Sequence, residues 1–432
     1  MKLKISNKTF YRRHSYELER FVEGKDSLHI INIKSKSKVS DKHSDLIYLD
    51  FDMPAQEIEI SKTYDVIVLT DIVELHPDIF LFLKDLSEKL NFNGKLIVTS
   101  FNYKYKFLVN FLELIRLKDS SRSYSYMRNK NLKNITSGLG YDYINTFTKQ
   151  ILPFHFFGLG YLINVILELI FYIFGLGIKT YSIFRVQNKY TSSYSKALII
   201  PAKNEEGNLE NLIRRLPQEQ NYEIIIPCGV SEDNTVEVAK ELVNKFTNFN
   251  IKSFVQTEKG KANAVWEALE VVDSEIVAIL DADISVDPET IPNFFEILDN
   301  NQADFVNGTR LIYQMEKGSM RHINHLGNRV FQFVVSKVIN YPLTDSLCGT
   351  KVFRREHYLN IQEWQKRLIT KDPFGDFDLI FSAAYTGQKI IEYPIHYKTR
   401  TYGKTQISRF RDGFKLIKYL LNSYFVLNTS RR

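Results

Sequence analysis

Short runs of β-branched and other apolar residues alternate with helical patterns through two stretches of the chain. In the first stretch, YDVIVL (64–69) and KLIVTS (95–100) predict buried strands. The sequence HPDIFLFLKDLSEKLN between them predicts a helix that begins near Pro77. A strand–helix–strand unit of this kind is typical of an α/β sheet.

The second alternation lies in the C-terminal half of the chain and is more regular. Its expected strands are KALII (196–200), EIII (223–226), IKSFV (251–255), EIVAIL (275–280) and DFVNG (304–308), and its expected helices lie near 206–216, 233–246, 260–270 and 289–299. The polar stretch 186–195 has no periodicity and separates the two alternations. We therefore expect an α/β protein of two domains, 1–188 and 196–432, joined by a linker at 189–195. Each domain is expected to be a doubly wound, mainly parallel sheet.

One segment, residues 151–178, is apolar over a length that would suffice to cross a bilayer. It contains His155, Asn164 and Glu168, and a charge at the bilayer centre is costly. We favour a buried or membrane-surface hairpin at the helical end of the first domain over a transmembrane helix. The N-terminal residues lack the apolar core of a signal peptide.

The composition is that of a globular protein, with 44% hydrophobic and 25% charged residues in 432. These values exclude collagen-like and wholly disordered chains. Two cysteines, Cys228 and Cys348, exclude a disulfide scaffold and indicate a reducing compartment. The nine histidines have no zinc-ligand spacing.

The net charge of +7 lies entirely in the first part of the chain. Residues 1–192 hold 27 basic and 20 acidic residues, whereas residues 193–432 hold 30 of each. Because the second domain is neutral, we expect no nucleic-acid partner, and the basic excess indicates that the first domain contacts something acidic.

Two carboxylates, Asp281 and Asp283, directly follow the expected strand 275–280. Open α/β sheets bind ligands at the carboxyl ends of their strands. Carboxylate oxygens suit Mg²⁺ or Mn²⁺ bridging a diphosphate, where the metal offsets charge on a leaving group. The alternative is an acidic turn before a helix that begins at Pro288.

Three further loops follow strands of the same domain. PAKNEE (201–206) and SEDNT (231–235) offer polar groups, and KGKANA (259–264) places Lys259 and Lys261 at a helix N-terminus, where phosphates bind. Ordinary helix capping explains each loop equally well when it is taken alone.

In order, these motifs and the later DFVNGTRL, DSLCGTKVFRREHY, DPFGDFDLIF and RTYGKTQISRF resemble a family 2 glycosyltransferase of GT-A fold over about residues 195–412. The later motifs are most similar to the dolichol- or polyprenyl-phosphate sugar synthase branch. The resemblance implies metal-dependent, inverting transfer of a sugar from a nucleoside-diphosphate donor to a polyprenyl phosphate or a membrane-associated glycan.

The resemblance also implies roles for individual residues. Those implied to bind the donor are Pro201, Ala202, Glu205, Ser231, Asp233, Lys259, Lys261 and Asp281. The metal ligands would be Asp281 and Asp283, and the acceptor or phosphate contacts would be Arg310, Arg400 and Lys404.

The implied catalytic residues are Asp376 and Asp378. Asp376 is the preferred base for a hydroxyl acceptor. A lipid phosphate is already an anion and needs no base.

One position departs from the family. Cys228 stands at or next to the carboxylate with which relatives read the nucleotide base, so the donor base remains open between uridine and guanosine. A small residue filling space is the favoured interpretation of Cys228, ahead of a reactive thiol.

Residues 64–102 resemble the central part of a class I S-adenosylmethionine-dependent methyltransferase. Such enzymes need a glycine-rich first turn, but residues 27–50 contain no glycine and instead carry Lys34, Lys36, Lys38 and Lys42. We expect a degenerate, inactive domain that serves docking, oligomerisation or membrane attachment. The lysines also fit an ordinary solvated face.

The last helical pattern, 407–428, places Phe410, Phe414, Ile417 and Leu421 near one face. Its polar side carries Arg409, Arg411, Lys415 and Lys418. A basic amphipathic helix suits a membrane interface or packing on its own domain. We expect a cytoplasmic enzyme, peripheral at the inner face of the plasma membrane.

Three alternatives remain. Nucleotidyl transfer would release pyrophosphate, but the glycine- and arginine-rich opening turn of such enzymes is missing. A non-catalytic scaffold for glycan assembly would not need the intact DAD, GDFDL and RTYGKT motifs. A bifunctional methyltransferase and glycosyltransferase would bind S-adenosylmethionine.

Overall fold

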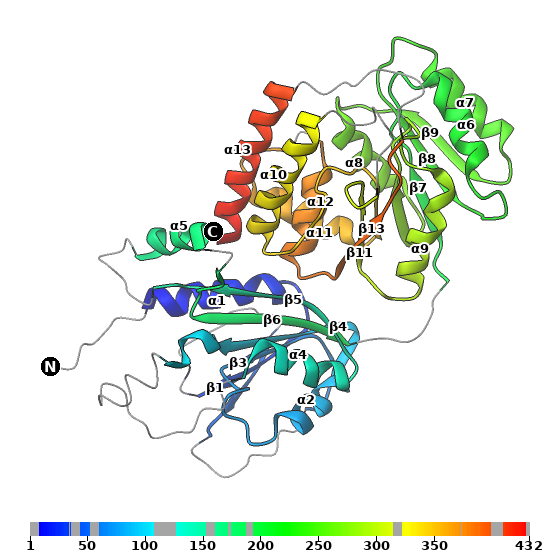
Figure 1. Cartoon of the computed structure of the whole chain (residues 1–432). Helices are drawn as coiled ribbons and strands as arrows, with labels where there is room; N and C mark the ends of the chain where they lie inside the picture. Colours follow the sequence, from blue (N-terminus) through cyan, green and yellow to red (C-terminus); the bar gives the residue numbers. More distant parts are fainter. Residues whose placement is uncertain are drawn as a thin grey trace. The chain divides into compact units, whose positions relative to one another are not determined.

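In the computed structural model the chain forms two compact units, an N-terminal unit of Met1–Asn188 with Asn428–Arg432 and a C-terminal unit of Lys189–Leu427. The structure describes residues 8–33, 35, 44–51, 60–107, 127–152, 160–171, 174–186, 193–313, 322–372, 374–398 and 409–428. Each unit contains a mostly parallel sheet with helices (Figure 1), which confirms the predicted fold class. Most of the expected linker, 189–192, lies outside the described residues.

The sheet of the N-terminal unit has six strands in the order β2-β1-β3-β4-β6-β5. The strands are β1 (Ser27–Asn32), β2 (Ser44–Leu49), β3 (Tyr64–Thr70), β4 (Leu90–Phe101), β5 (Tyr141–Lys149) and β6 (Lys179–Val186). The described helices are α1 (Lys8–Val22), α2 (Ile79–Ser87), α4 (Asn129–Gly138) and α5 (Gly160–Phe171). The first four strands are parallel, and β6 runs antiparallel to both of its neighbours. The strand order reverses between β1 and β3, which defines a topological switch point.

Helix α5 contains the central part of the apolar segment 151–178. It is 12 residues long, and no helix in the described part of the chain combines the length and apolar composition needed to cross a bilayer. Its polar residues Asn164 and Glu168 are buried, whereas Leu162, Ile166 and Ile170 are about half exposed. The Glu168 carboxylate accepts hydrogen bonds from Arg13 and from the backbone N–H of Gln150. The helix is therefore attached to its unit through polar contacts and presents apolar side chains outward.

The sheet of the C-terminal unit has seven strands in the order β13-β11-β12-β10-β7-β8-β9. The strands are β7 (Lys196–Ile199), β8 (Glu223–Cys228), β9 (Asn250–Val255), β10 (Ile276–Ile279), β11 (Phe305–Thr309), β12 (Lys351–Arg354) and β13 (Ile390–Pro394). The helices are α6 (Glu206–Arg215), α7 (Thr235–Lys245), α8 (Lys261–Val271), α9 (Ile291–Asp299), α10 (His322–Ile339), α11 (His357–Arg367), α12 (Asp376–Tyr385) and α13 (Arg409–Asn428). Strand β12 is antiparallel to β10 and β11, and the other pairings are parallel.

The predicted strands and helices of the second alternation match β7 to β11 and α6 to α9. Central strands of a parallel sheet are covered on both faces, and so their sequences read as continuous apolar runs. Leu198, Ile224, Ala278 and Val306 illustrate this, because each is fully buried in one core cluster. This core fixes the strand ends from which the polar loops project.

Candidate active site

The loops after β7 and β8 hold each other through reciprocal hydrogen bonds. The backbone N–H of Asn204 donates to Ser231 Oγ over 3.1 Å, and that of Glu205 donates to Thr235 Oγ1 over 2.8 Å. The Asp233 carboxylate accepts from the N–H of Glu206 over 3.2 Å, at the start of α6. Ser231 and Asp233 therefore fix the loop after β8 against the loop after β7. Their oxygens can accept further hydrogen bonds as well.

The turn after β7 continues the sheet past the end of the strand. The N–H of Ala202 donates to Pro227 O over 3.1 Å, and the N–H of Gly229 donates to Ala202 O over 2.8 Å. A Cβ on Gly229 would lie 3.2 Å from Lys203 Cβ, so the Lys203 stem covers this glycine. Pro201 and Ala202 thus lie in a rigid edge beside the loop 229–233.

Cys228 is buried at the end of β8, and burial raises the pKa of its thiol to about 11. It packs in the same core cluster as Leu198 and Ala278. This supports the interpretation as a space-filling residue.

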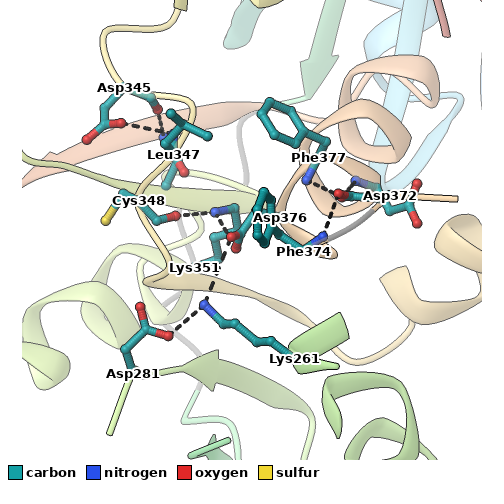
Figure 2. A network of polar contacts seen from close by, with 12 residues as sticks. Lys261, Asp281, Asp345, Leu347, Cys348, Lys351, Asp372, Phe374, Asp376 and Phe377 are labelled. Carbon is teal, nitrogen blue, oxygen red and sulfur yellow. Dashed lines mark hydrogen bonds and ion pairs between the residues drawn. The ribbon is translucent and has the colours of Figure 1, made fainter. Parts of the chain in front are cut away.

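Four charged side chains of the C-terminal unit contact one another in alternating sign (Figure 2). In order of contact they are Asp281, Lys261, Asp376 and Lys351. The Lys261 ammonium lies 2.6 Å from Asp281 Oδ1 and 3.9 Å from Asp376 Oδ2. The Lys351 ammonium lies 3.1 Å from Asp376 Oδ1 and also donates to the Cys348 carbonyl. Burial lowers the pKa of Lys261, but the Asp281 and Asp376 carboxylates outweigh it and raise that pKa above its ordinary value. The network joins the end of β10 to the start of α12.

The backbone of the loop 345–350 lies close to the Asp281 carboxylate. A Cβ on Gly349 would lie 2.1 Å from Asp281 Oδ2 and 2.8 Å from Lys261 Nζ. Real Cβ atoms essentially never come within 3.0 Å of such neighbours. Only glycine at position 349 leaves the Asp281 carboxylate where it is.

Asp283 is buried, and its Oδ1 accepts the N–H of Ser285 over 3.0 Å. Between them, Ile284 has a φ of 53°. A β-branched residue in this left-handed region costs of the order of 1–3 kcal/mol and marks functional turns. Asp281, in contrast, keeps a third of its side chain exposed.

The N-terminus of α12 gathers three carboxylates. Asp372 accepts the N–H groups of Phe374, Phe377 and Asp378 over 2.9, 2.7 and 2.9 Å. Burial, and next the Asp378 carboxylate, raise the pKa of Asp372 above its ordinary value. Asp372 therefore caps the helix that begins at Asp376.

Asp378 has both carboxylate oxygens engaged away from this network. Tyr419 OH donates to Oδ1 over 2.7 Å, and Gln365 Nε2 donates to Oδ2 over 2.9 Å. Of the two predicted catalytic residues, Asp376 alone contacts the lysine network, and Asp378 contacts α11 and α13.

Arg310 follows β11 and is buried. Its Nε and Nη2 donate to the two oxygens of Asp345 over 2.7 and 2.9 Å, and its N–H donates to Asp345 over 3.1 Å. Burial alone would lower the pKa of Arg310 and raise that of Asp345. The opposite charge of the partner outweighs burial in each case, so the pKa of Arg310 is raised and that of Asp345 is lowered. The guanidinium of Arg310, which is predicted to contact a phosphate, thus also holds the loop before Gly349 through Asp345.

The remaining predicted residues are Lys259, Glu205, Arg400 and Lys404. Lys259 is exposed, and Glu205 Oε2 accepts from Asn208 Nδ2 over 2.6 Å on the rim of the first loop. Arg400 and Lys404 lie outside the described residues. Sequence reasoning assigned no role to Lys351, Asp345 and Asp372, although the recognised motifs DSLCGTKVFRREHY and DPFGDFDLIF contain all three.

The cluster thus lies at the carboxyl end of β10, the place at which open α/β sheets bind ligands. Residues 197–361 match the family model described as Glycosyl transferase family 2. The chain therefore contains a family 2 glycosyltransferase domain, as the ordered motifs predicted.

Curated relatives match over about half of the chain. They include "Low-salt glycan biosynthesis hexosyltransferase Agl6" of Haloferax volcanii, 26% identical over 52% of this chain and 52% of its own length. "Dolichol-phosphate mannosyltransferase" of Pyrococcus furiosus is 26% identical over 53% and 62%. "Dolichyl-phosphate hexose transferase" of Haloferax volcanii is 26% identical over 52% and 92%. The match thus spans between half and two thirds of the first two relatives.

Among solved structures, glucosyl-3-phosphoglycerate synthase from Mycobacterium tuberculosis, in complex with Mn²⁺, uridine diphosphate and phosphoglyceric acid, is similar with a TM-score of 0.41. It is 18% identical, and the match covers 54% of this chain and 79% of that chain.

Proposed function

We propose that the C-terminal unit transfers a sugar, with inversion, from a nucleoside-diphosphate donor to a polyprenyl phosphate or a membrane-associated glycan. The observation that carries the proposal is the network of Asp281, Lys261, Asp376 and Lys351 at the carboxyl end of the sheet. It joins a DxD pair, a cation suited to phosphate and a carboxylate that can accept a proton. The relatives named for dolichol-phosphate chemistry support the choice of acceptor.

The carboxylates of Asp281 and Asp283 would suit Mg²⁺ or Mn²⁺ together with a bound diphosphate. Within the described residues, no group of three or more histidine, cysteine or carboxylate side chains is placed to hold a metal ion. Mg²⁺ is commonly held by one or two carboxylates and substrate phosphates, which matches Asp281 and Asp283. A bound metal would offset the charge of the leaving diphosphate.

Lys261 would exchange its partners when the donor binds. Its ammonium now neutralises Asp281, and a diphosphate held over α8 would offer it a second anion. Lys259, two residues earlier, is exposed and would contact the same phosphates. Pro201, Ala202, Glu205, Ser231 and Asp233 would form the edge against the nucleoside, whose base remains open.

Asp376 would act as base toward a hydroxyl acceptor. Lys351 and Lys261 hold its carboxylate from two sides, so the group is oriented before substrate binds. With a lipid phosphate the acceptor is already anionic, and the same carboxylate would then only orient Lys261. Arg310, Arg400 and Lys404 stay proposed as phosphate contacts.

The outer face of α13 supports the proposed membrane contact. Phe414, Ile417, Leu421 and Phe425, here called the outer row, follow one another at helical spacing and are 71%, 51%, 53% and 42% exposed. Lys415 and Lys418 are exposed beside the row, and residues 413–428 contain no acidic residue. Apolar side chains flanked by lysines suit the interface of an anionic bilayer, here proposed to be the inner face of the plasma membrane.

The N-terminal unit is proposed to be a degenerate methyltransferase-like module that attaches the enzyme to an acidic partner or surface. Its parallel strands and switch point between β1 and β3 support a doubly wound ancestry. The basic stretch after β1 lies largely outside the described residues.

A donor screen tests the activity. Uridine- and guanosine-diphosphate sugars, each with Mn²⁺ or Mg²⁺, are ranked by thermal shift, and the best donor is assayed for nucleoside-diphosphate release with polyprenyl phosphate. A true donor at 100-fold above its dissociation constant stabilises by about 2.7 kcal/mol. Release of pyrophosphate instead would indicate nucleotidyl transfer, and absence of any stabilising nucleotide sugar would favour a scaffold.

A further inference from the structure

Helix α13 carries two different faces. Its inner face buries Leu416, Tyr419, Leu420 and Ser423 against the C-terminal unit, and its outer row is exposed. Tyr419 packs against Phe377 and Phe381 of α12, with ring centroids 6.1 and 5.7 Å away. The helix that presents the outer row therefore also touches the helix that begins at Asp376.

Two polar side chains of the inner face hold the segment 369–378. Tyr419 OH donates to Asp378 Oδ1 over 2.7 Å and accepts from Trp364 Nε1 over 3.0 Å. One helical turn on, Asn422 Oδ1 accepts from the N–H of Ile369 and from the N–H and hydroxyl of Thr370, over 2.9, 3.2 and 3.0 Å. Both ends of the segment are thus bonded to α13.

Within this segment, hydrogen bonds of Asp372 hold the residues that follow Asp376. Asp372 follows the part held by Asn422, and its carboxylate accepts the N–H groups of Phe377 and Asp378. Asp376 lies between these contacts and faces Lys351 and Lys261. If α13 leaves the unit, Asp378 loses a hydrogen bond in a buried place, and residues 369–370 lose three.

We propose that α13 couples bilayer contact to the catalytic segment, with Tyr419 and Asn422 as positioning residues for Asp376. The inference rests on the proposed function, in particular on the bilayer as occupant of the outer row. A ligand shifts an equilibrium only through its different affinity for the two states. The docked helix presents the row already ordered, whereas an undocked segment must lose conformational entropy on binding. The bilayer therefore favours docked α13 and, through it, an ordered segment 369–378.

Hydrogen exchange of the full chain with and without vesicles of phosphatidylcholine and phosphatidylglycerol in a 3:1 ratio tests this coupling. At lipid ten times above half-saturation, linkage predicts about tenfold slower exchange of the Phe377 and Asp378 amides, if opening requires release of the bilayer. Flotation of the same samples measures binding independently of exchange.

Two test variants, each with a matched control, separate membrane binding from its effect on the segment. Phe414→Ser with Leu421→Ser should abolish flotation and the slowing, whereas Leu359→Ser, at an apolar residue 66% exposed on α11, should leave both unchanged. Tyr419→Phe keeps the ring and removes the hydroxyl, so it should float normally but lose most of the slowing. Tyr358→Phe is its matched control, because it removes a tyrosine hydroxyl on α11 that lies 3.4 Å from Glu270 Oε1.

Flotation of the wild type without slower exchange at 377 and 378, or with faster exchange, overturns the coupling and leaves the membrane contact standing. Equal slowing in Tyr419→Phe overturns the role of Tyr419. Absence of flotation overturns both the coupling and the membrane contact, while sugar transfer is decided separately by the donor screen.

Discussion

The Lys351 ammonium lies 3.1 Å from the Asp376 carboxylate, and the lysine side chain is fully buried. It enters the site from β12, the antiparallel strand between β10 and β11. Lys351→Met should therefore leave Asp376 without its nearest cation and the Cys348 carbonyl without a donor. Breaking a buried pair from one side costs about 3–5 kcal/mol.

We expect this variant to unfold more easily by an amount in that range and to lose at least 100-fold in turnover. Urea unfolding followed by tryptophan fluorescence and the sugar-transfer assay measure the two effects. Lys366→Met, which breaks an exposed pair with Glu363, is the matched control. It should change the free energy of unfolding by no more than about 0.5 kcal/mol and leave turnover unchanged. A stable and fully active Lys351→Met enzyme would show that Asp376 needs no buried partner.

Gly349→Ala places a methyl group where the Asp281 carboxylate lies, because the added Cβ would come 2.1 Å from Oδ2. We expect the carboxylate or the loop to move and Mn²⁺-dependent turnover to fall at least tenfold. Gly413→Ala, in α13 with nothing within 4 Å, should keep activity and stabilise the helix by about 0.5–1 kcal/mol. Unchanged turnover in Gly349→Ala would place the reacting groups away from Asp281.

Lys261→Gln separates metal binding from donor binding. The ammonium 2.6 Å from Asp281 competes with a metal ion for that carboxylate, so its loss should tighten Mn²⁺ binding in the absence of nucleotide. In the presence of a donor, the same change removes a phosphate contact and should lower turnover. Electron paramagnetic resonance of free Mn²⁺ and the transfer assay measure the two opposite effects. Weaker Mn²⁺ binding without nucleotide would contradict the competition.

The strands of the C-terminal unit were predictable because a parallel core requires continuous apolar runs, and Leu198 and Ile224 lie in such runs. Strand β12 was missed, since KVFR is four residues long and begins with a lysine whose burial depends on Asp376. The DxD pair was predictable from its place after β10. The partners of Arg310 and Asp376 come from segments more than twenty residues distant along the chain, and no local pattern encodes such pairings.

Arg310→Lys tests whether this residue positions a loop or contacts an acceptor. Lysine cannot reproduce the two-pronged bond to Asp345, so the buried carboxylate would keep its backbone donors and one side-chain donor from residue 310 at most. We expect a loss of about 3–5 kcal/mol in unfolding free energy. A normal stability with a raised KM for the acceptor would instead assign Arg310 to phosphate binding. Arg214→Lys, at an exposed pair with Glu210, is the control.

Glu74 predicts a pH dependence that belongs to the N-terminal unit. It is buried, and burial, together with the nearby Asp71 carboxylate, raises its pKa to about 7 from 4.5. The unfolded chain therefore releases this proton at a lower pH than the folded chain. Between about pH 4.5 and 7 the Glu74 carboxyl holds its proton in the folded state and not in the unfolded chain, so its contribution to stability falls as pH rises and levels off above 7.

The size of this loss is about 3 kcal/mol, at about 1.4 kcal/mol for each pKa unit. Burial lowers the pKa of His14 to about 3 and of His29 to about 4, so both imidazoles take up a proton on unfolding below about pH 6.5, and their contribution makes stability rise with pH up to that value. The contribution of Glu74 is therefore read as the difference between the wild type and Glu74→Gln. Both tryptophans, Trp266 and Trp364, lie in the C-terminal unit, so a circular-dichroism transition without a fluorescence change reports the N-terminal unit.

The stability of the wild type relative to Glu74→Gln should fall as pH rises from about 5 to 7, and Glu74→Gln should be the more stable of the two at pH 8. Its amide oxygen can still accept the N–H of Phe101, which Glu74 Oε1 accepts over 2.5 Å. Glu88→Gln, at an exposed position, should leave the slope unchanged. If wild type and Glu74→Gln share one slope, the buried carboxyl does not hold its proton at neutral pH, and the pH dependence arises from groups outside this part of the sheet.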